Sequence, residues 1–318
     1  MRHLLILALA SFFAQLVDGA LGMGYGLTST SLLLAAGIAP AVASASVHAG
    51  EVVTTLASGI SHWRFGNVDW EVTRRLALPG AVGAFAGALF LSNLPVNLAR
   101  PAVSAFLLVL GIVVLLRPRP GRTPQDAPAR PFPRRLLLPL GLTAGFLDAA
   151  GGGGWGPVTT ATLMARRNSV ARTVVGSVDT SEFLVALGAT LGFLPALGWE
   201  GVNLTWVAAI VVGGVVAAPL AAWAVRLIPA HVLGRAVGVL IVFSNARVVL
   251  GALGVELPAA LLAASLVVLA AAPAVASRVA GRLAARTAVG TRTGRAAAEL
   301  SGRPSGAAAS TPRPPRSS

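Results

Sequence analysis

The sequence predicts an all-α polytopic membrane protein, built from two inverted repeats of about four helical elements each and one extra C-terminal span. Three observations predict this fold class. Hydrophobic residues make up 55% of the 318-residue chain and charged residues only 11%, a composition typical of many membrane crossings. A glycine-rich motif centred on an aspartate occurs twice, and arginines gather in two segments that mark one side of the membrane.

The glycine-rich motif interrupts a long apolar run in each half of the chain. It reads DAAGGGGWGP from Asp148 and DGALGMGYG from Asp18. The aspartates and three glycines of each copy correspond at an offset of 130 residues, namely Gly22, Gly24 and Gly26 with Gly152, Gly154 and Gly156. Consecutive glycines and a proline hold a helix poorly, so the first helix of each repeat is predicted to be broken at membrane depth, as in transporters.

A second pair of matching segments supports an internal duplication. The segment SVHAGE from Ser46 aligns with SVDTSE from Ser177 at an offset of 131 residues, with serine, valine and glutamate in the same places. This order repeats the order of the glycine motifs. We therefore predict that the two halves of the chain have the same succession of helices.

The apolar runs divide the chain in order. The first membrane repeat is residues 1–116, with a broken run at 4–36 and spans at 40–61, 76–92 and 97–116. A basic cytoplasmic linker follows at 117–135. The second repeat and a final span occupy 136–277, with a broken run at 136–165 and spans near 170–195, 204–227, 232–252 and 257–277. Residues 278–318 form an Arg-rich tail predicted to be disordered, and a signal peptide at the start is the disfavoured alternative.

Charge placement predicts the topology. The linker holds six arginines and the tail eight, and such segments usually lie on the cytoplasmic side. Keeping Arg166, Arg167 and Arg172 on that side as well requires residues 136–165 to form a re-entrant pair of half-helices. Thirty helical residues would measure about 45 Å, against roughly 30 Å of hydrocarbon. The first copy then has the opposite orientation; a long, tilted or kinked single span is the alternative.

Five of the eleven acidic residues are predicted to lie at membrane depth, where ionisable groups are functional candidates by default. With the one mid-span histidine, the residues predicted to couple transport or hold the glycine loops are Asp18, His48, Glu51, Asp148, Asp179 and Glu182. His48 and Glu51 share a helix face, and the equivalent pair in the second half does the same. Two alternatives stay open: the two motif aspartates only cap half-helices, or His48 is a satisfied core histidine.

The breaks are also predicted to bind substrate between them. Unwound backbone and half-helix N-termini offer N–H groups and a positive dipole end, which suit an anion, and hydroxyls at 28–31 and 159–160 add donors. The predicted substrate-binding residues are Gly22, Gly24, Gly26, Thr28, Ser46, Gly152, Gly153, Gly154, Gly156, Thr159 and Ser177. The glycines could instead serve only tight helix packing. Arg247 is expected to snorkel rather than pair with the anion.

These features resemble the TauE/SafE sulfite-exporter family of bacterial membrane permeases. The two Asp-centred motifs, the paired halves and the basic linker carry the resemblance, over roughly residues 10–275. Residues 47–62 and 176–183 look like one branch of the family, although Gly176-Ser177-Val178 stands where the family commonly has Gly-Thr-Ser. The resemblance implies export of a small sulfur-containing anion, such as sulfite or an organosulfonate.

The predicted function is therefore an ion-coupled secondary transporter of the bacterial inner membrane that exports a small anion. The alternative is a cation or metal permease that uses the intramembrane carboxylates and His48. No enzyme is expected, because the chain has four histidines, no cysteine and no zinc-protease or Gly-x-Ser-x-Gly motif. No cofactor, resident metal or nucleic-acid partner is expected; the expected partners are a small anionic substrate, membrane lipid and a second copy in a homodimer.

Overall fold

The computed structural model describes residues 2–21, 23–116, 132–164, 170–198, 204–224, 230–255 and 258. This part of the chain is mostly helical and has no strand, which confirms the all-α prediction. Its helices are α1 (Arg2–Leu21), α2 (Tyr25–Ala35), α3 (Pro40–Arg64), α4 (Trp70–Ser92), α5 (Val96–Leu116), α6 (Arg134–Gly151), α7 (Trp155–Met164), α8 (Ala171–Leu197), α9 (Leu204–Ala224) and α10 (Ala230–Ala252). The predicted final span, the tail and most of the linker lie outside the described residues.

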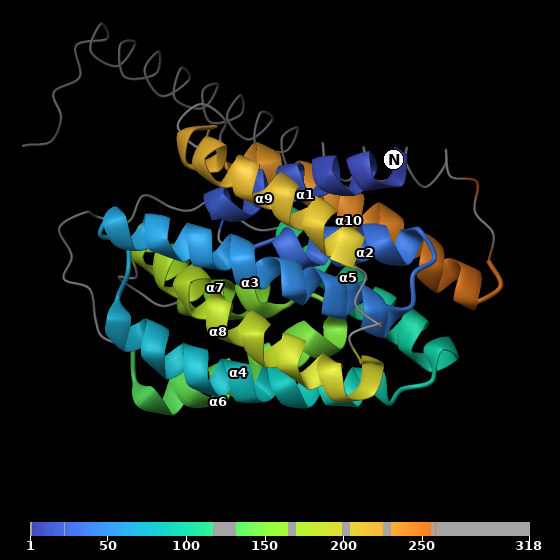
Figure 1. The fold of residues 1–318 in the computed structure, drawn as a ribbon, viewed down its shortest axis with the longest axis horizontal. Helices are drawn as coiled ribbons and strands as arrows, with labels where there is room; N and C mark the ends of the chain where they lie inside the picture. The colour runs from blue at the N-terminus through green and yellow to red at the C-terminus, as the bar shows by residue number, and fades with distance from the viewer. Residues whose placement is uncertain are drawn as a thin grey trace, which may run out of the picture. The chain divides into compact units, whose positions relative to one another are not determined.

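The helices of the two halves make matching contacts. α4 packs against α6 and α8 of the second half, and α9 packs against α1 and α3 of the first half. α3 also packs against its counterpart α8, and α5 against its counterpart α10. Figure 1 shows this interleaving, with α4 running alongside α6. Each half is therefore covered mainly by helices of the other half.

Small residues let α4 approach α6 closely. A Cβ added at Gly83 would lie 2.9 Å from the carbonyl carbon of Leu142, and one at Gly87 would lie 3.1 Å from that of Phe146. Gly145 of α6 meets the backbone of α4 in the same way. Because these contacts are backbone against backbone, no larger side chain fits without separating the helices. The predicted close packing of residues 76–92 is thus present.

Three of the described helices are long and apolar enough to cross a membrane. These are Trp70–Ser92, Val96–Leu116 and Arg172–Leu197, and shorter apolar stretches occur at Leu7–Leu16, Leu204–Ala217 and Gly238–Ala252. Large apolar side chains such as Leu78, Val82 and Val109 face outward. Exposed apolar side chains on long helices suit a lipid environment. The fold is accordingly that of a multi-pass membrane protein.

The first helix of each half is broken at its glycines. α6 ends at Gly151, and the next residues, Gly152 and Gly153, have φ of +72° and +139° before α7 begins. In the first half α1 ends at Leu21, and Gly24 has φ of +130° just before α2. Such φ values are readily adopted only by glycine, which explains why the motif needs glycines at these places. Gly22 lies outside the described residues.

Candidate functional site

Asp148 joins the two sides of the second break. Its Oδ1 accepts hydrogen bonds from the backbone N–H groups of Gly154, at 2.6 Å, and Trp155, at 2.9 Å. The carboxylate at the end of α6 therefore caps α7, with its charge at the positive end of the helix dipole. Asp18 accepts from the backbone N–H of Tyr25, the residue equivalent to Trp155. The capping role considered as an alternative is thus present in both halves.

The second oxygen of Asp148 binds His48. The distance from Asp148 Oδ2 to His48 Nε2 is 3.1 Å, and His48 Nδ1 lies 2.8 Å from the carbonyl oxygen of Ser44. A carbonyl oxygen only accepts, so Nδ1 carries a hydrogen, and a second proton must lie between Nε2 and the carboxylate. Glu51 Oε2 is 3.9 Å from the same Nε2. We call Asp148, His48 and Glu51 the histidine triad; its geometry requires one proton shared between the imidazole and the Asp148 carboxylate.

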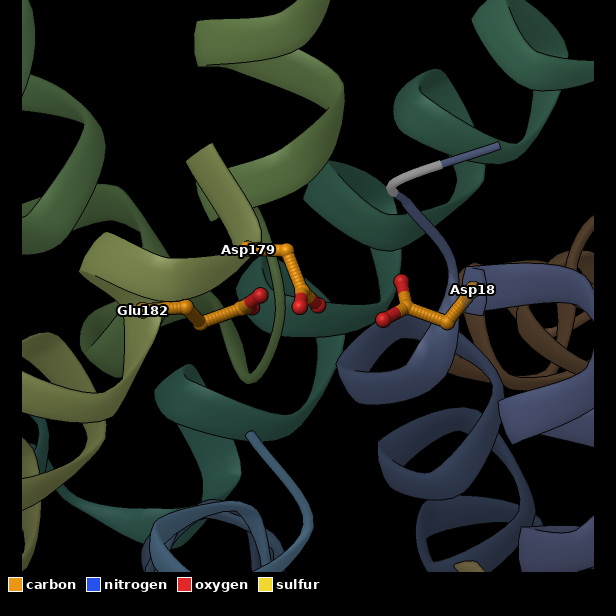
Figure 2. Close-up of side chains that lie close together, drawn as sticks. All are labelled: Asp18, Asp179 and Glu182. Atoms are coloured by element: carbon orange, nitrogen blue, oxygen red, sulfur yellow. The ribbon is translucent and has the colours of Figure 1, made fainter. Parts of the chain in front are cut away.

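The equivalent residues of the other half form a second cluster, the carboxylate triad of Asp18, Asp179 and Glu182. One oxygen from each lies within 4.8 Å of the others. Figure 2 shows Asp179 and Glu182 reaching from α8 toward Asp18 on α1. The three residues are 4%, 2% and 9% exposed. His62 Nε2 lies 3.8 Å from Asp179 Oδ2, but neither Asp179 oxygen has a hydrogen-bond partner.

Each triad combines an aspartate from one half of the chain with two residues, one turn apart on a single helix, from the other half. His48 and Glu51 on α3 meet Asp148, whereas Asp179 and Glu182 on α8 meet Asp18. Glu182 also interacts electrostatically with Asp18, Glu51 and Asp148. The six residues predicted to couple transport or hold the loops therefore lie in one buried region, where α3 and α8 pack against each other.

The two glycine breaks touch each other beside these triads. A Cβ added at Gly26 would lie 3.1 Å from the Cα of Gly153 and 3.0 Å from Glu51 Oε1. One added at Gly152 would lie 3.0 Å from Thr30 Oγ1. The structure thus brings together the predicted glycines 26, 152 and 153, in a contact that only hydrogen side chains permit. Gly154 belongs to the same turn through its bond to Asp148.

Of the four hydroxyls after the first break, three are unpaired, whereas Ser31 Oγ accepts from Asn245 Nδ2. Thr28, Ser29 and Thr30 are buried, and their hydroxyl oxygens have no hydrogen-bond partner. Thr159, by contrast, donates to the carbonyl oxygen of Trp155. Buried hydroxyls are normally paired, so this run offers three donors to a ligand.

The two predicted serines of the duplicated segments serve helix geometry in this structure. Ser46 Oγ donates to the carbonyl oxygen of Val42, at 2.8 Å. Ser177 Oγ accepts from the backbone N–H of Asp69, at 2.8 Å, and so holds the start of α4 against α8. Neither hydroxyl lies among the unpaired groups of the described residues.

Ser44 and the aromatic residue after each break also support the site and were not predicted. Ser44 Oγ donates to the carbonyl oxygen of Ala149, at 2.8 Å, and so ties α3 to the end of α6. Tyr25 OH and Trp155 Nε1 bind the backbone of Ile210 and Val178, in α9 and α8. The available sequence signals were a serine four residues before His48 and an aromatic residue in the same place of both motifs.

Trp155→Phe tests one of these anchors. Trp155 is fully buried, and its Nε1–H donates to Val178 O at 3.1 Å, so the variant loses this hydrogen bond and part of the buried ring volume, while Val178 O keeps its bond from the Ser181 hydroxyl. We expect the free energy of unfolding to fall by about 1–3 kcal/mol, measured by denaturant titration of purified protein in detergent. Trp70→Phe is the control, because Trp70 is 47% exposed. Equal stability of the two variants would contradict the anchoring role.

Comparison with known proteins places these features in a family. The family described as Sulfite exporter TauE/SafE matches residues 7–248. The chain is 53% identical over 251 residues to "Probable membrane transporter protein YtnM" of Bacillus subtilis (strain 168), covering 78% of this chain and 83% of that protein. It is 27% identical over 223 residues to "Probable membrane transporter protein YdhB" of the same organism, covering 69% and 88%. No solved structure matches.

Proposed function

The chain belongs to the TauE/SafE sulfite exporter family, and from this premise we propose that it exports a small sulfur-containing oxyanion, sulfite or an organosulfonate, across the bacterial inner membrane. In this proposal the protein is a secondary transporter, and the shared proton of the histidine triad couples export to an ion gradient. The substrate lies beside the contact of the two glycine breaks. No catalytic step is part of the proposal.

The observation that carries the proposal is the run of unpaired hydroxyls at Thr28, Ser29 and Thr30. Leaving a buried donor without a partner costs about 1–3 kcal/mol, so these hydroxyls favour a ligand that accepts hydrogen bonds. Successive helical residues point about 100° apart, so one ligand is bonded by some of the three hydroxyls and not by all of them. Sulfite and sulfonate groups each carry three acceptor oxygens. The run begins at the fourth residue of α2, near a helix N-terminus, where the dipole favours an anion. Gly24 and Gly26 allow close approach to this backbone.

The proposed mechanism uses inverted repeats that alternate access to the site. α7 has 10 residues, about 15 Å of helix, and is too short to cross a roughly 30 Å hydrocarbon core, whereas α6 has 18 residues, about 27 Å. A half-helix of the length of α7 directly after the break supports a re-entrant pair. Movement of one half against the other would separate Gly26 from Gly153 and open the site. The Arg-rich linker then lies on the cytoplasmic side.

The test is flux of sulfite and a sulfonate into inside-out vesicles, with and without an imposed proton gradient. We expect gradient-dependent accumulation, and an increase in KM of about 10-fold or more for at least one of Thr28→Val and Thr30→Val, because that variant loses a hydrogen bond to a charged ligand. Thr162→Val is the matched control, since the Thr162 hydroxyl donates to Val158 within α7. Unchanged KM in both hydroxyl variants would contradict the proposed binding site.

A second candidate function is the cation or metal permease, which the carboxylate triad favours. The same vesicles separate the two proposals. Accumulation of Mn²⁺ or Ca²⁺ in the absence of any sulfur oxyanion would support the permease. Sulfite accumulation without movement of Mn²⁺ or Ca²⁺ would support the anion exporter.

A further inference from the structure

The two triads are equivalent in position but differ in charge. Position 48 of the first half corresponds to position 179 of the second, and the residues are histidine and aspartate. In the histidine triad the imidazole holds a proton between itself and Asp148. In the carboxylate triad a third acidic group, Asp179, takes that place. Equivalent helices therefore place a proton-sharing imidazole, that of His48, in one triad and only carboxylates in the other.

The carboxylate triad also lacks the hydrogen bonds that would hold three buried acids together. Asp18 has the backbone N–H of Tyr25, but both oxygens of Asp179 are buried, and the Ser58 side chain interacts with them without meeting hydrogen-bond geometry. Figure 2 shows the Asp179 carboxylate directed at Asp18. A buried carboxylate without donors is costly unless it takes up a proton or binds a cation. The position of His48 in the other triad indicates where that positive charge would lie.

The spacing of the oxygens selects the kind of cation. Three oxygens within 4.8 Å of one another lie no more than about 2.8 Å from a common point, so small side-chain movements would bring them to the 2.3–2.6 Å or so of Ca²⁺–oxygen bonds, whereas the shorter bonds of Mg²⁺ need a larger movement. The donor set is carboxylate alone, which suits hard cations such as Ca²⁺ and Mn²⁺ rather than Zn²⁺ or copper. A divalent charge would offset two of the three carboxylates.

We propose that Asp18, Asp179 and Glu182 bind one hard divalent cation of the Ca²⁺ or Mn²⁺ class at the meeting of α1 and α8. The histidine triad performs the same charge compensation with a proton. This inference deepens the proposed anion export, because a cation held here offsets the carboxylates that would otherwise repel an oxyanion at the breaks. It differs from the sequence prediction, in which no metal site was expected.

The experiment titrates purified full-length protein in detergent with Mn²⁺ and follows free Mn²⁺ by electron paramagnetic resonance, without any sulfur anion present. We expect one site per chain in the wild type, displaced by Ca²⁺. Asp179→Asn and Asp179→His should bind at least about 100-fold more weakly. Asp179→His recreates the composition of the histidine triad, so it is expected to fold, as checked by gel filtration and circular dichroism.

Two further variants make the result specific. Glu71→Gln removes a surface carboxylate that pairs with Arg75 and should leave Mn²⁺ binding unchanged. His48→Asp gives the other triad three carboxylates and should add a second site. No Mn²⁺ or Ca²⁺ binding at millimolar concentration, or equal binding by wild type and folded Asp179→His, would overturn the proposal and leave protons as the compensating charge. Because no anion is present, this outcome is independent of whether sulfite is exported.

Discussion

Asp148→Asn is expected to reduce sulfite or sulfonate export to the rate of vesicles without the protein, while the variant stays folded in the membrane. The asparagine Oδ1 can still accept from Gly154 and Trp155, so the cap of α7 remains. Its Nδ2 can donate to His48 Nε2, with Nδ1–H still bonded to Ser44. Every hydrogen bond is kept, and only the shared proton is lost. The free energy of unfolding should change by less than about 1 kcal/mol.

Two comparison variants separate the effect of losing the shared proton from the effect of losing the helix cap. Asp148→Ala removes the cap and leaves His48 without its buried partner, so it should be destabilised by about 3–5 kcal/mol as well as inactive. Asp69→Asn is the matched control: Asp69 Oδ1 caps α4 by accepting from Glu71 and Val72, and none of the histidine–carboxylate pairs of the described residues includes Asp69. Export is measured in inside-out vesicles at equal protein content. Normal export by Asp148→Asn would exclude the shared proton from the transport cycle.

The helix breaks were predictable from sequence, whereas the composition of the triads was not. Consecutive glycines followed by a proline disfavour a helix by local chemistry alone, and the breaks at Gly152 and Gly24 agree with this. His48 and Asp148 are 100 residues apart, and their contact depends on how the two halves cross. Helical periodicity identifies a shared face but not the helix that packs against it.

Ser177 shows that a duplicated position does not by itself reveal what its side chain does. Its place in a duplicated segment suggested substrate binding, yet its hydroxyl accepts from the backbone N–H of Asp69 and positions α4. Duplication preserves residues for packing as well as for binding, and one sequence does not separate the two. The unpaired hydroxyls after the first break were distinguished from Thr159 only by their surroundings in three dimensions.

Gly153→Ala is expected to have the largest effect on folding among the glycine variants. Gly153 has φ of +139°, and a Cβ there would lie 2.6 Å from the carbonyl carbon of Gly26. The variant therefore combines backbone strain with a clash between the two breaks. Strain of this kind costs about 1–3 kcal/mol, and overpacking adds a further 1–3 kcal/mol or so. We expect a loss of about 2–6 kcal/mol in unfolding free energy, or no folded protein.

Alanine variants at two other glycines separate the contribution of backbone strain to the loss of stability from that of the steric clash. Gly37 has φ of +89° but open space around a Cβ, so Gly37→Ala should show strain alone. Gly251 lies in α10, also with open space, and its alanine variant should be neutral or more stable by up to about 1 kcal/mol. Denaturant titration in detergent ranks the three. If Gly153→Ala were no less stable than Gly37→Ala, the breaks would not be in tight contact. The expected order would mean that the backbones of Gly26 and Gly153 are in contact and must separate when the proposed site opens. Because the added methyl group clashes only while the two breaks are in contact, Gly153→Ala should destabilise the closed state more than it weakens substrate binding.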